Sequence, residues 1–204
     1  MATKRNKFYS TLNADEIREM GIETILDAHD WGEPTPVEPS DWLKLTLQKN
    51  LRLPLSTEKA KSEFIIAPIL TELHELNPNI FTFFSGNTFD VDKSLGLKGR
   101  CDFIFSRKPK AVSIEAPIFS IIEAKNDGIE EAYPQCIAQL YAADLFNQRY
   151  NIEFPFIYGA VTTGFSWKFI RLADKVASVD TEIFYMDQLP ELLGILQKVV
   201  NYYR

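Results

Sequence analysis

Long apolar stretches are missing from this sequence of 204 residues. No apolar run approaches the roughly 18 residues that a membrane-spanning helix needs. Residues 1–10 include basic side chains but no apolar segment follows them, which argues against a secretory signal. We therefore expect a cytoplasmic protein that has no membrane partner.

Cysteine and histidine are also scarce, with two residues of each. The sequence has no C-x-x-C pair, and His29 and His74 are too few for a histidine-based zinc site. Cys101 falls in a predicted strand and Cys136 in a predicted helix, so we expect two buried, reduced thiols. There is no glycine-rich phosphate loop, internal repeat or low-complexity segment either.

Basic residues are outnumbered, because 22 Lys and Arg face 28 Asp and Glu and the net charge is −6. This balance argues against a protein that coats nucleic acid, since such domains are usually basic. An acidic protein can still carry a local basic strip. The candidates for such a strip are Lys93, Lys98, Arg100, Arg107, Lys108 and Lys110. The alternative is that these are solvated loop charges.

The most informative stretch of the chain contains two predicted strands. The first, residues 101–106, carries Asp102 near its start, and the second, residues 118–124, is apolar on both faces until Glu123. A strand of the second kind is expected inside a sheet. Side chains alternate along a strand, so Glu123 and Lys125 point to the same face. If the two strands pair antiparallel, Asp102 can lie beside Glu123.

These residue types suit a specific chemistry. Two carboxylates can hold a hard divalent cation through oxygen ligands, with positions left for water and a phosphate. A lysine beside them can hold the attacking water or stabilise negative charge on the phosphate. The alternative is a strand-end ion pair, in which Glu123 and Lys125 compensate the cost of burying each other's charge.

Asp102, followed after a hairpin by Glu123-Ala124-Lys125, resembles the motif of the PD-(D/E)XK nuclease superfamily, which has the restriction-endonuclease-like fold. The family usually has proline or another small residue before the aspartate, whereas this chain has Cys101. The resemblance implies a Mg²⁺ or Mn²⁺ site formed by Asp102, Glu123 and the backbone carbonyl of Ala124. It also implies that Lys125 orients the hydrolytic water.

The resemblance implies two further site residues, one on each of two predicted helices. Glu63, on a helix predicted over residues 57–76, takes the place of a family glutamate that faces the metal. Gln135 and Gln139, on a helix predicted over residues 130–149, share one face, and Gln139 is the better match to a family glutamine beside the metal. The alternatives are an ordinary exposed helix glutamate and two surface amides.

The whole pattern predicts an α/β fold with a central mixed sheet flanked by helices. The resemblance implies a core of the order αβββαβ over residues 56–172, within a single domain of residues 1–204. A helical extension is expected over residues 1–55 and a C-terminal helix in residues 173–204. The remaining predicted elements are helices over 13–29, 41–49 and 187–203, a strand over 80–91, and two strands within 156–172, the second at a sheet edge.

Two hypotheses follow from the sequence. The first is a Mg²⁺-dependent nuclease that hydrolyses phosphodiester bonds of nucleic acid, with DNA favoured over RNA and a homodimer left open. The second is a non-catalytic nucleic-acid-binding or assembly protein on the same fold, because a fold does not fix a function.

Overall fold

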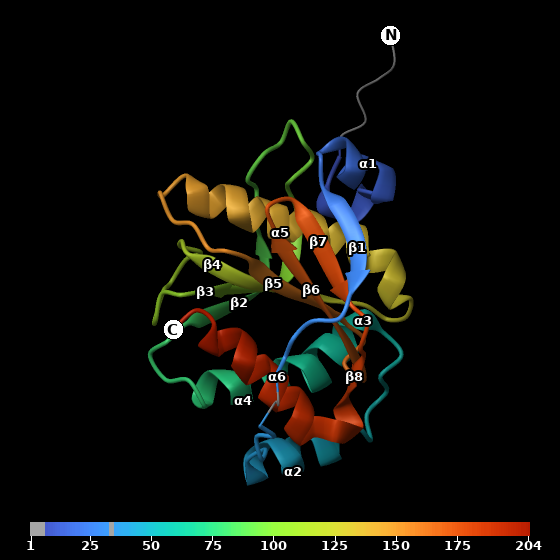
Figure 1. Ribbon diagram of the computed structural model, residues 1–204. Helices are drawn as coiled ribbons and strands as arrows, with labels where there is room; N and C mark the ends of the chain where they lie inside the picture. Colours follow the sequence, from blue (N-terminus) through green and yellow to red (C-terminus); the bar gives the residue numbers. More distant parts are fainter. Residues whose placement is uncertain (1–6, 33–34) are drawn as a thin grey trace.

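One mixed sheet of eight strands organises the computed structural model, which describes residues 7–32 and 35–204 (Figure 1). The strand order is β1-β7-β6-β5-β4-β3-β2, and β8 pairs with β6. The strands are β1 (Glu23–Asp27), β2 (Thr82–Thr88), β3 (Arg100–Ser106), β4 (Ile118–Ala124), β5 (Ile157–Thr162), β6 (Ser166–Ala173), β7 (Val176–Asp180) and β8 (Phe184–Tyr185).

Helices cover both faces of the sheet, with α5 on one face and α4 and α6 on the other (Figure 1). The α-helices are α1 (Ala14–Glu19), α2 (Asp41–Asn50), α3 (Glu58–Lys61), α4 (Ala67–Glu75), α5 (Tyr133–Gln148) and α6 (Leu189–Asn201). A π-helical segment, η2 (Ser62–Ile66), joins α3 to α4, and the short 3₁₀ turns are η1 (Tyr9–Thr11), η3 (Ile129–Ala132) and η4 (Met186–Gln188). No helix in the described part of the chain has the length and apolar character needed to cross a membrane.

The predicted antiparallel meander is confirmed in β2, β3 and β4. All seven residues of β4 are buried, as its apolar sequence predicts. A hydrophobic core lies on each face of the sheet. Because side chains alternate along β4, Ile121 packs with α5 in one core and Ile122 packs in the core on the opposite face. After β4 the chain crosses over through α5, and β5 returns parallel to β4.

Within the predicted helical N-terminal extension, the helix over 41–49 is confirmed as α2, but the helix predicted over 13–29 is wrong in its second half, where β1 lies. The helix predicted over residues 13–29 ends at Glu19, because Gly21 adopts a φ of +77° that favours glycine. The Ile22 N–H then bonds back to the Ile17 carbonyl (3.3 Å), and β1 follows as an edge strand parallel to β7. Residues 1–6 and 33–34 of the predicted extension lie outside the described residues.

The sheet also continues further than the sequence predicts. We expected β6 at an edge, but β7 pairs with β6 and β1 pairs with β7. The turn between β6 and β7 places Asp174 and Lys175 at φ values of +46° and +63°, as a tight hairpin requires. The sequence contains no glycine at this turn, so the usual hairpin signal was missing.

The helix predicted over residues 57–76 contains Pro68, and the π-helical segment η2 precedes this proline in the structure. Proline lacks an N–H group, and its ring excludes the carbonyl of Phe64, four residues earlier, from ordinary helical geometry. The side chain of Asn50 donates a hydrogen bond to that carbonyl at 2.8 Å. The helix from α3 to α4 therefore continues without leaving this carbonyl unpaired.

A buried polar clip holds the segment after β1 against the sheet. The Trp31 ring stacks on Tyr158, with ring centroids 5.1 Å apart. Its Nε1 donates to Oδ2 of Asp180 at 2.6 Å, and the backbone N–H of His29 donates to Oδ1 of the same carboxylate. Asp180 is completely buried, so these donors compensate for the loss of its hydration.

Replacing Trp31 with phenylalanine should therefore destabilise the protein through the carboxylate. Trp31→Phe keeps an aromatic ring but removes the N–H that bonds to Asp180, which typically costs about 1–3 kcal/mol. The matched control is Trp42→Phe, because Trp42 is half exposed, and a change below about 0.5 kcal/mol is expected there. Urea unfolding measures the change in the free energy of unfolding for both variants. Equal changes would contradict the role assigned to the hydrogen bond between Trp31 and Asp180.

Candidate functional site

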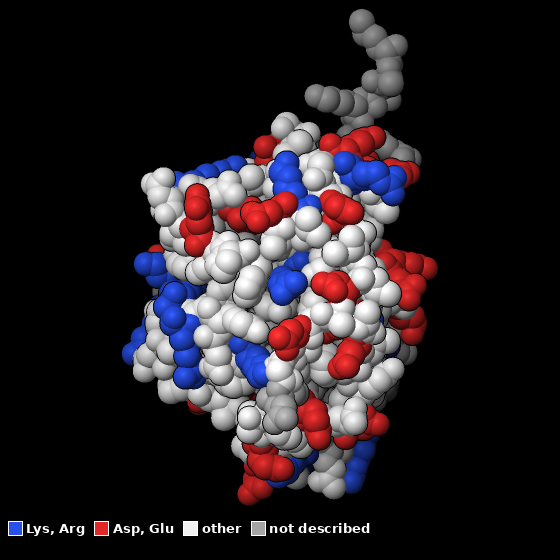
Figure 2. Space-filling model, in the orientation of Figure 1, with Lys and Arg blue, Asp and Glu red and all other residues white. Residues whose placement is uncertain are grey.

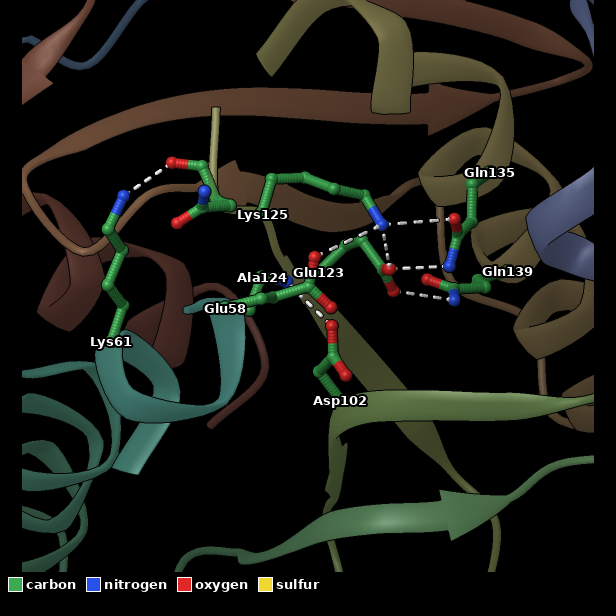
Figure 3. A network of polar contacts seen from close by, with 9 residues as sticks. Glu58, Lys61, Asp102, Glu123, Ala124, Lys125, Gln135 and Gln139 are labelled. Carbon is green, nitrogen blue, oxygen red and sulfur yellow. Dashed lines mark hydrogen bonds and ion pairs between the residues drawn. The ribbon is translucent and has the colours of Figure 1, made fainter. Parts of the chain in front are cut away.

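The site lies where the end of β4 meets the start of β3. The ladder between these strands ends at the pair Phe103 and Ile122, and continuing its register by one residue sets Asp102 opposite Glu123. Lys125 directly follows β4. The meander thus brings together the three residues that the sequence singled out, as Figure 3 shows.

Glu123 is the centre of the polar network in Figure 3, and its side chain is only 2% exposed. Its Oε1 accepts hydrogen bonds from Lys125 Nζ at 2.8 Å and from Gln135 Nε2. Its Oε2 accepts a hydrogen bond from Gln139 Nε2 at 2.8 Å. The structure therefore brings both predicted glutamines to Glu123, although only Gln139 was favoured from the sequence.

Asp102 fixes the backbone at the end of β4. Its Oδ2 accepts a hydrogen bond from the Ala124 N–H at 2.8 Å. This contact places Asp102 beside the peptide whose carbonyl the sequence analysis assigned to a metal. The contact itself involves the N–H group, so the role assigned to the carbonyl stays a prediction.

The two carboxyl groups influence each other's ionisation. Burial raises the pKa of Glu123 to about 7, and the negative charge of Asp102 adds to the shift, although Lys125 and Gln139 oppose it. Burial also raises the pKa of Asp102, against the lowering effect of the Ala124 N–H. Burial tends to lower the pKa of Lys125, but the nearby Glu123 carboxylate outweighs this and raises it. The site therefore resists holding two negative charges with a single lysine as compensation.

Gln139 carries an unusual acceptor. The residue is completely buried, and its Oε1 has no hydrogen-bond partner among residues 7–32 and 35–204. A buried acceptor without a partner costs free energy. Since the Nε2 of the same amide bonds to Glu123, the amide group that carries this oxygen lies next to the carboxylate.

Glu63 and Glu58 occupy different positions relative to the site. Glu63, the predicted helix carboxylate, is half exposed and pairs with Lys59 at 2.7 Å. Glu58, which the sequence analysis did not select, lies 4.0 Å from Lys125 Nζ and extends toward it in Figure 3. The position of Glu58 near Lys125 follows from a contact of Lys61 on the same helix. The Nζ of Lys61 donates a hydrogen bond to the carbonyl of Asn126 and so holds α3 against the loop after β4.

A groove of about 320 Å³ adjoins the site. One side comes from α3 and η2 through Glu58, Lys59, Ser62 and Glu63. The other side comes from β2 and β3 through Ser85, Gly86, Arg100 and Asp102. Glu63 therefore lies in the same groove as Asp102, although within the described residues its ion pair is with Lys59 and not with the network around Glu123.

The basic residues considered as one strip belong to different places. Arg100 lines the groove beside Asp102, whereas Arg107, Lys108 and Lys110 follow the opposite end of β3. Lys93 pairs with Asp90 at 3.6 Å. The side of the molecule in Figure 2 shows acidic and basic side chains scattered among each other over a mostly uncharged surface.

The metal-ligating capacity of the site rests on few groups. Within the described residues, no group of three or more histidine, cysteine, aspartate or glutamate side chains is arranged to hold a metal ion. Cys101 and Cys136 are buried free thiols, as predicted, and burial raises the pKa of both. The carboxylates of Asp102 and Glu123 are the acidic side chains that the structure brings together at the end of β4.

The raised pKa of Glu123 predicts a pH-dependent stability for the metal-free protein. The folded state binds this proton more tightly than the unfolded state, whose glutamate has a pKa near 4.5. The stabilisation is therefore complete below about pH 4.5 and is lost as the pH rises to about 7. Between pH 5 and pH 8 this group alone should lower the free energy of unfolding by roughly 2–3 kcal/mol.

Urea unfolding in the presence of a chelator measures this difference. Glu123→Gln should remove most of it, whereas Glu63→Gln makes the same chemical change at a half-exposed position and should keep it. If the free energy of unfolding of Glu123→Gln depends on pH as strongly as that of the parent, a group other than Glu123 takes up the proton.

Comparisons with known proteins returned no match to a family model, to a curated protein or to a solved structure.

Proposed function

We propose that this protein is a metal-dependent nuclease whose core, residues 56–172, is of the PD-(D/E)XK type. The observation that carries the proposal is the convergence of Asp102, Glu123 and Lys125 at one end of the sheet, with the carboxyl groups close enough to raise the pKa of Glu123. The order of a helix, three antiparallel strands, a crossover helix and a parallel strand supports it.

The donor set fits Mg²⁺ or Mn²⁺. Asp102 and Glu123 are hard oxygen donors whose mutual repulsion a divalent cation would relieve. These two carboxylates and the Ala124 carbonyl would hold the ion, with Glu63 assigned a secondary part. When bound, the cation would neutralise phosphate charge and lower the pKa of a bound water molecule.

The protein side chains have separable roles in this proposal. Glu123 and Gln135 hold the Lys125 ammonium in place, at 2.8 and 3.2 Å, so that it can donate to the attacking water or to developing negative charge. The Gln139 Oε1, which has no partner within the described residues, accepts a hydrogen bond from that water. Glu58 lies on the groove side of Lys125 and favours its charged form.

The second candidate is a non-catalytic protein that binds nucleic acid on the same fold. One observation favours it: both oxygens of Glu123 already accept hydrogen bonds from protein groups, and Lys125 compensates its charge. Such a network can be purely structural. The two candidates differ in whether the protein hydrolyses any nucleic acid.

Substitution of the lysine and of the aspartate should separate the roles. Lys125→Ala removes a group that acts on water and on the transition state, so hydrolysis should fall by about 10²–10³ while Mn²⁺ binding persists. Asp102→Ala removes a ligand, so both Mn²⁺ binding and hydrolysis should be lost. Lys108→Ala, in the loop at the far end of β3, is the matched control and should retain the parent rate.

The rate of hydrolysis is measured with labelled DNA and RNA substrates, each in single-stranded, double-stranded and branched form, in the presence of Mg²⁺ or Mn²⁺. Calorimetry with Mn²⁺ measures the binding, and DNA is the favoured substrate. A Lys125→Ala protein that cleaves at the parent rate would reduce Lys125 to a strand-end ion pair. A parent protein that binds nucleic acid but cleaves none of these substrates would favour the second candidate.

A further inference from the structure

We propose that the groove beside Asp102 binds the sugar–phosphate backbone of a nucleic acid strand and does not recognise its bases. This inference rests on the proposed function of the adjoining site. It adds the mode of substrate binding and assigns Arg100 as the residue that contacts a phosphate. The consequence is binding and cleavage that do not depend on base sequence.

No aromatic side chain is among the described residues that line the groove. Proteins that hold the bases of single strands usually stack them on aromatic rings, and each stacked base contributes substantially to affinity. This groove instead offers the hydroxyls of Ser62 and Ser85 and the guanidinium of Arg100. Hydroxyl and guanidinium groups are typical contacts for phosphate oxygens and sugars, which carry no direct sequence information.

The charges of the groove leave Arg100 as the cation available to a ligand. Lys59 and Glu63 pair with each other at 2.7 Å and so cancel locally. Arg100 is exposed, and within the described part of the chain it makes no ion pair. Arg100 and Asp102 lie two residues apart on β3 and line the same groove, so a phosphate bound by Arg100 would lie near the Asp102 carboxylate.

Gly86 lines the groove and has no side chain that could fill part of it. It lies on the edge strand β2 between the pairs Ser85–Phe103 and Asn87–Cys101, which places it opposite Asp102. Its φ of +68° favours glycine, and a Cβ atom built there would meet nothing within 4 Å. The absent side chain allows a polymer backbone to lie close to the strand next to Asp102.

Two residues of the same strand provide a matched test. Arg100 begins β3 inside the groove, and Arg107 directly follows the other end of this strand. At about 3.4 Å per residue, the two positions lie roughly 24 Å apart. Arg100→Ala and Arg107→Ala remove the same charge and change the net charge equally, so general electrostatic attraction is controlled.

The experiment measures binding of the full chain to two fluorescent oligomers of about 16 units, with Ca²⁺ in place of Mg²⁺. One oligomer is single-stranded DNA of mixed sequence, and the other is its abasic counterpart, which has tetrahydrofuran in place of every nucleoside. Fluorescence anisotropy gives Kd over a range of salt concentrations, and gels verify that the oligomers stay intact.

We expect the parent protein to bind both oligomers with Kd values within about threefold. Arg100→Ala should weaken both about fivefold to tenfold and reduce the slope of log K against log salt by about one, as for the loss of one phosphate contact. Arg107→Ala should leave both affinities unchanged. An abasic oligomer that binds more than about tenfold more weakly than the DNA would overturn the inference, as would equal losses in the two variants.

Hydrolysis assays with Mg²⁺ distinguish a failure of this inference from a failure of the proposed function. If the parent cleaves DNA while Arg100→Ala binds and cleaves like the parent, the groove inference is wrong and the nuclease assignment stands. If the parent neither binds the oligomers nor cleaves any nucleic acid, both are wrong.

Discussion

The buried carboxylate of Glu123 is the group on which the site depends. A glutamate at the end of a strand with no exposed residue loses its hydration, and this loss raises its pKa to about 7. Three side-chain donors compensate for it, one from Lys125 and one each from Gln135 and Gln139. Because α5 supplies two of the three, the packing of α5 on the sheet and the ionisation of Glu123 are coupled.

The register of the sheet determines which groups can reach this carboxylate. Antiparallel pairing of β3 and β4 brings Asp102 to the same end as Glu123, and the parallel return of β5 requires a crossover, which α5 provides. On the other side, Lys61 holds α3 to the loop after β4, and the π-helical segment absorbs Pro68 without breaking the helix. The site thus draws on four segments that are distant in sequence.

Local pattern was enough to predict the elements with strong periodicity or strong apolar character. The apolar run of β4, the helix α5 and the meander that carries Asp102 follow from the sequence, and so does the convergence of Asp102, Glu123 and Lys125. The strand β1 was not predicted, because an apolar stripe continues past Gly21 and its edge position depends on pairing with β7. Which of the two glutamates, Glu58 or Glu63, lies near Lys125 depends on how α3 packs against the rest of the protein, and a local sequence pattern does not predict this packing.

The energetic cost of this network is itself an argument about function. A buried ion pair contributes little net stability, and apolar side chains of similar volume often stabilise a protein at least as well. Within the described residues, the Gln139 Oε1 of this network has no hydrogen-bond partner. The free acceptor, the opposed carboxyl groups and the adjoining open groove are all accounted for if the network holds a cation, a water molecule and a phosphate.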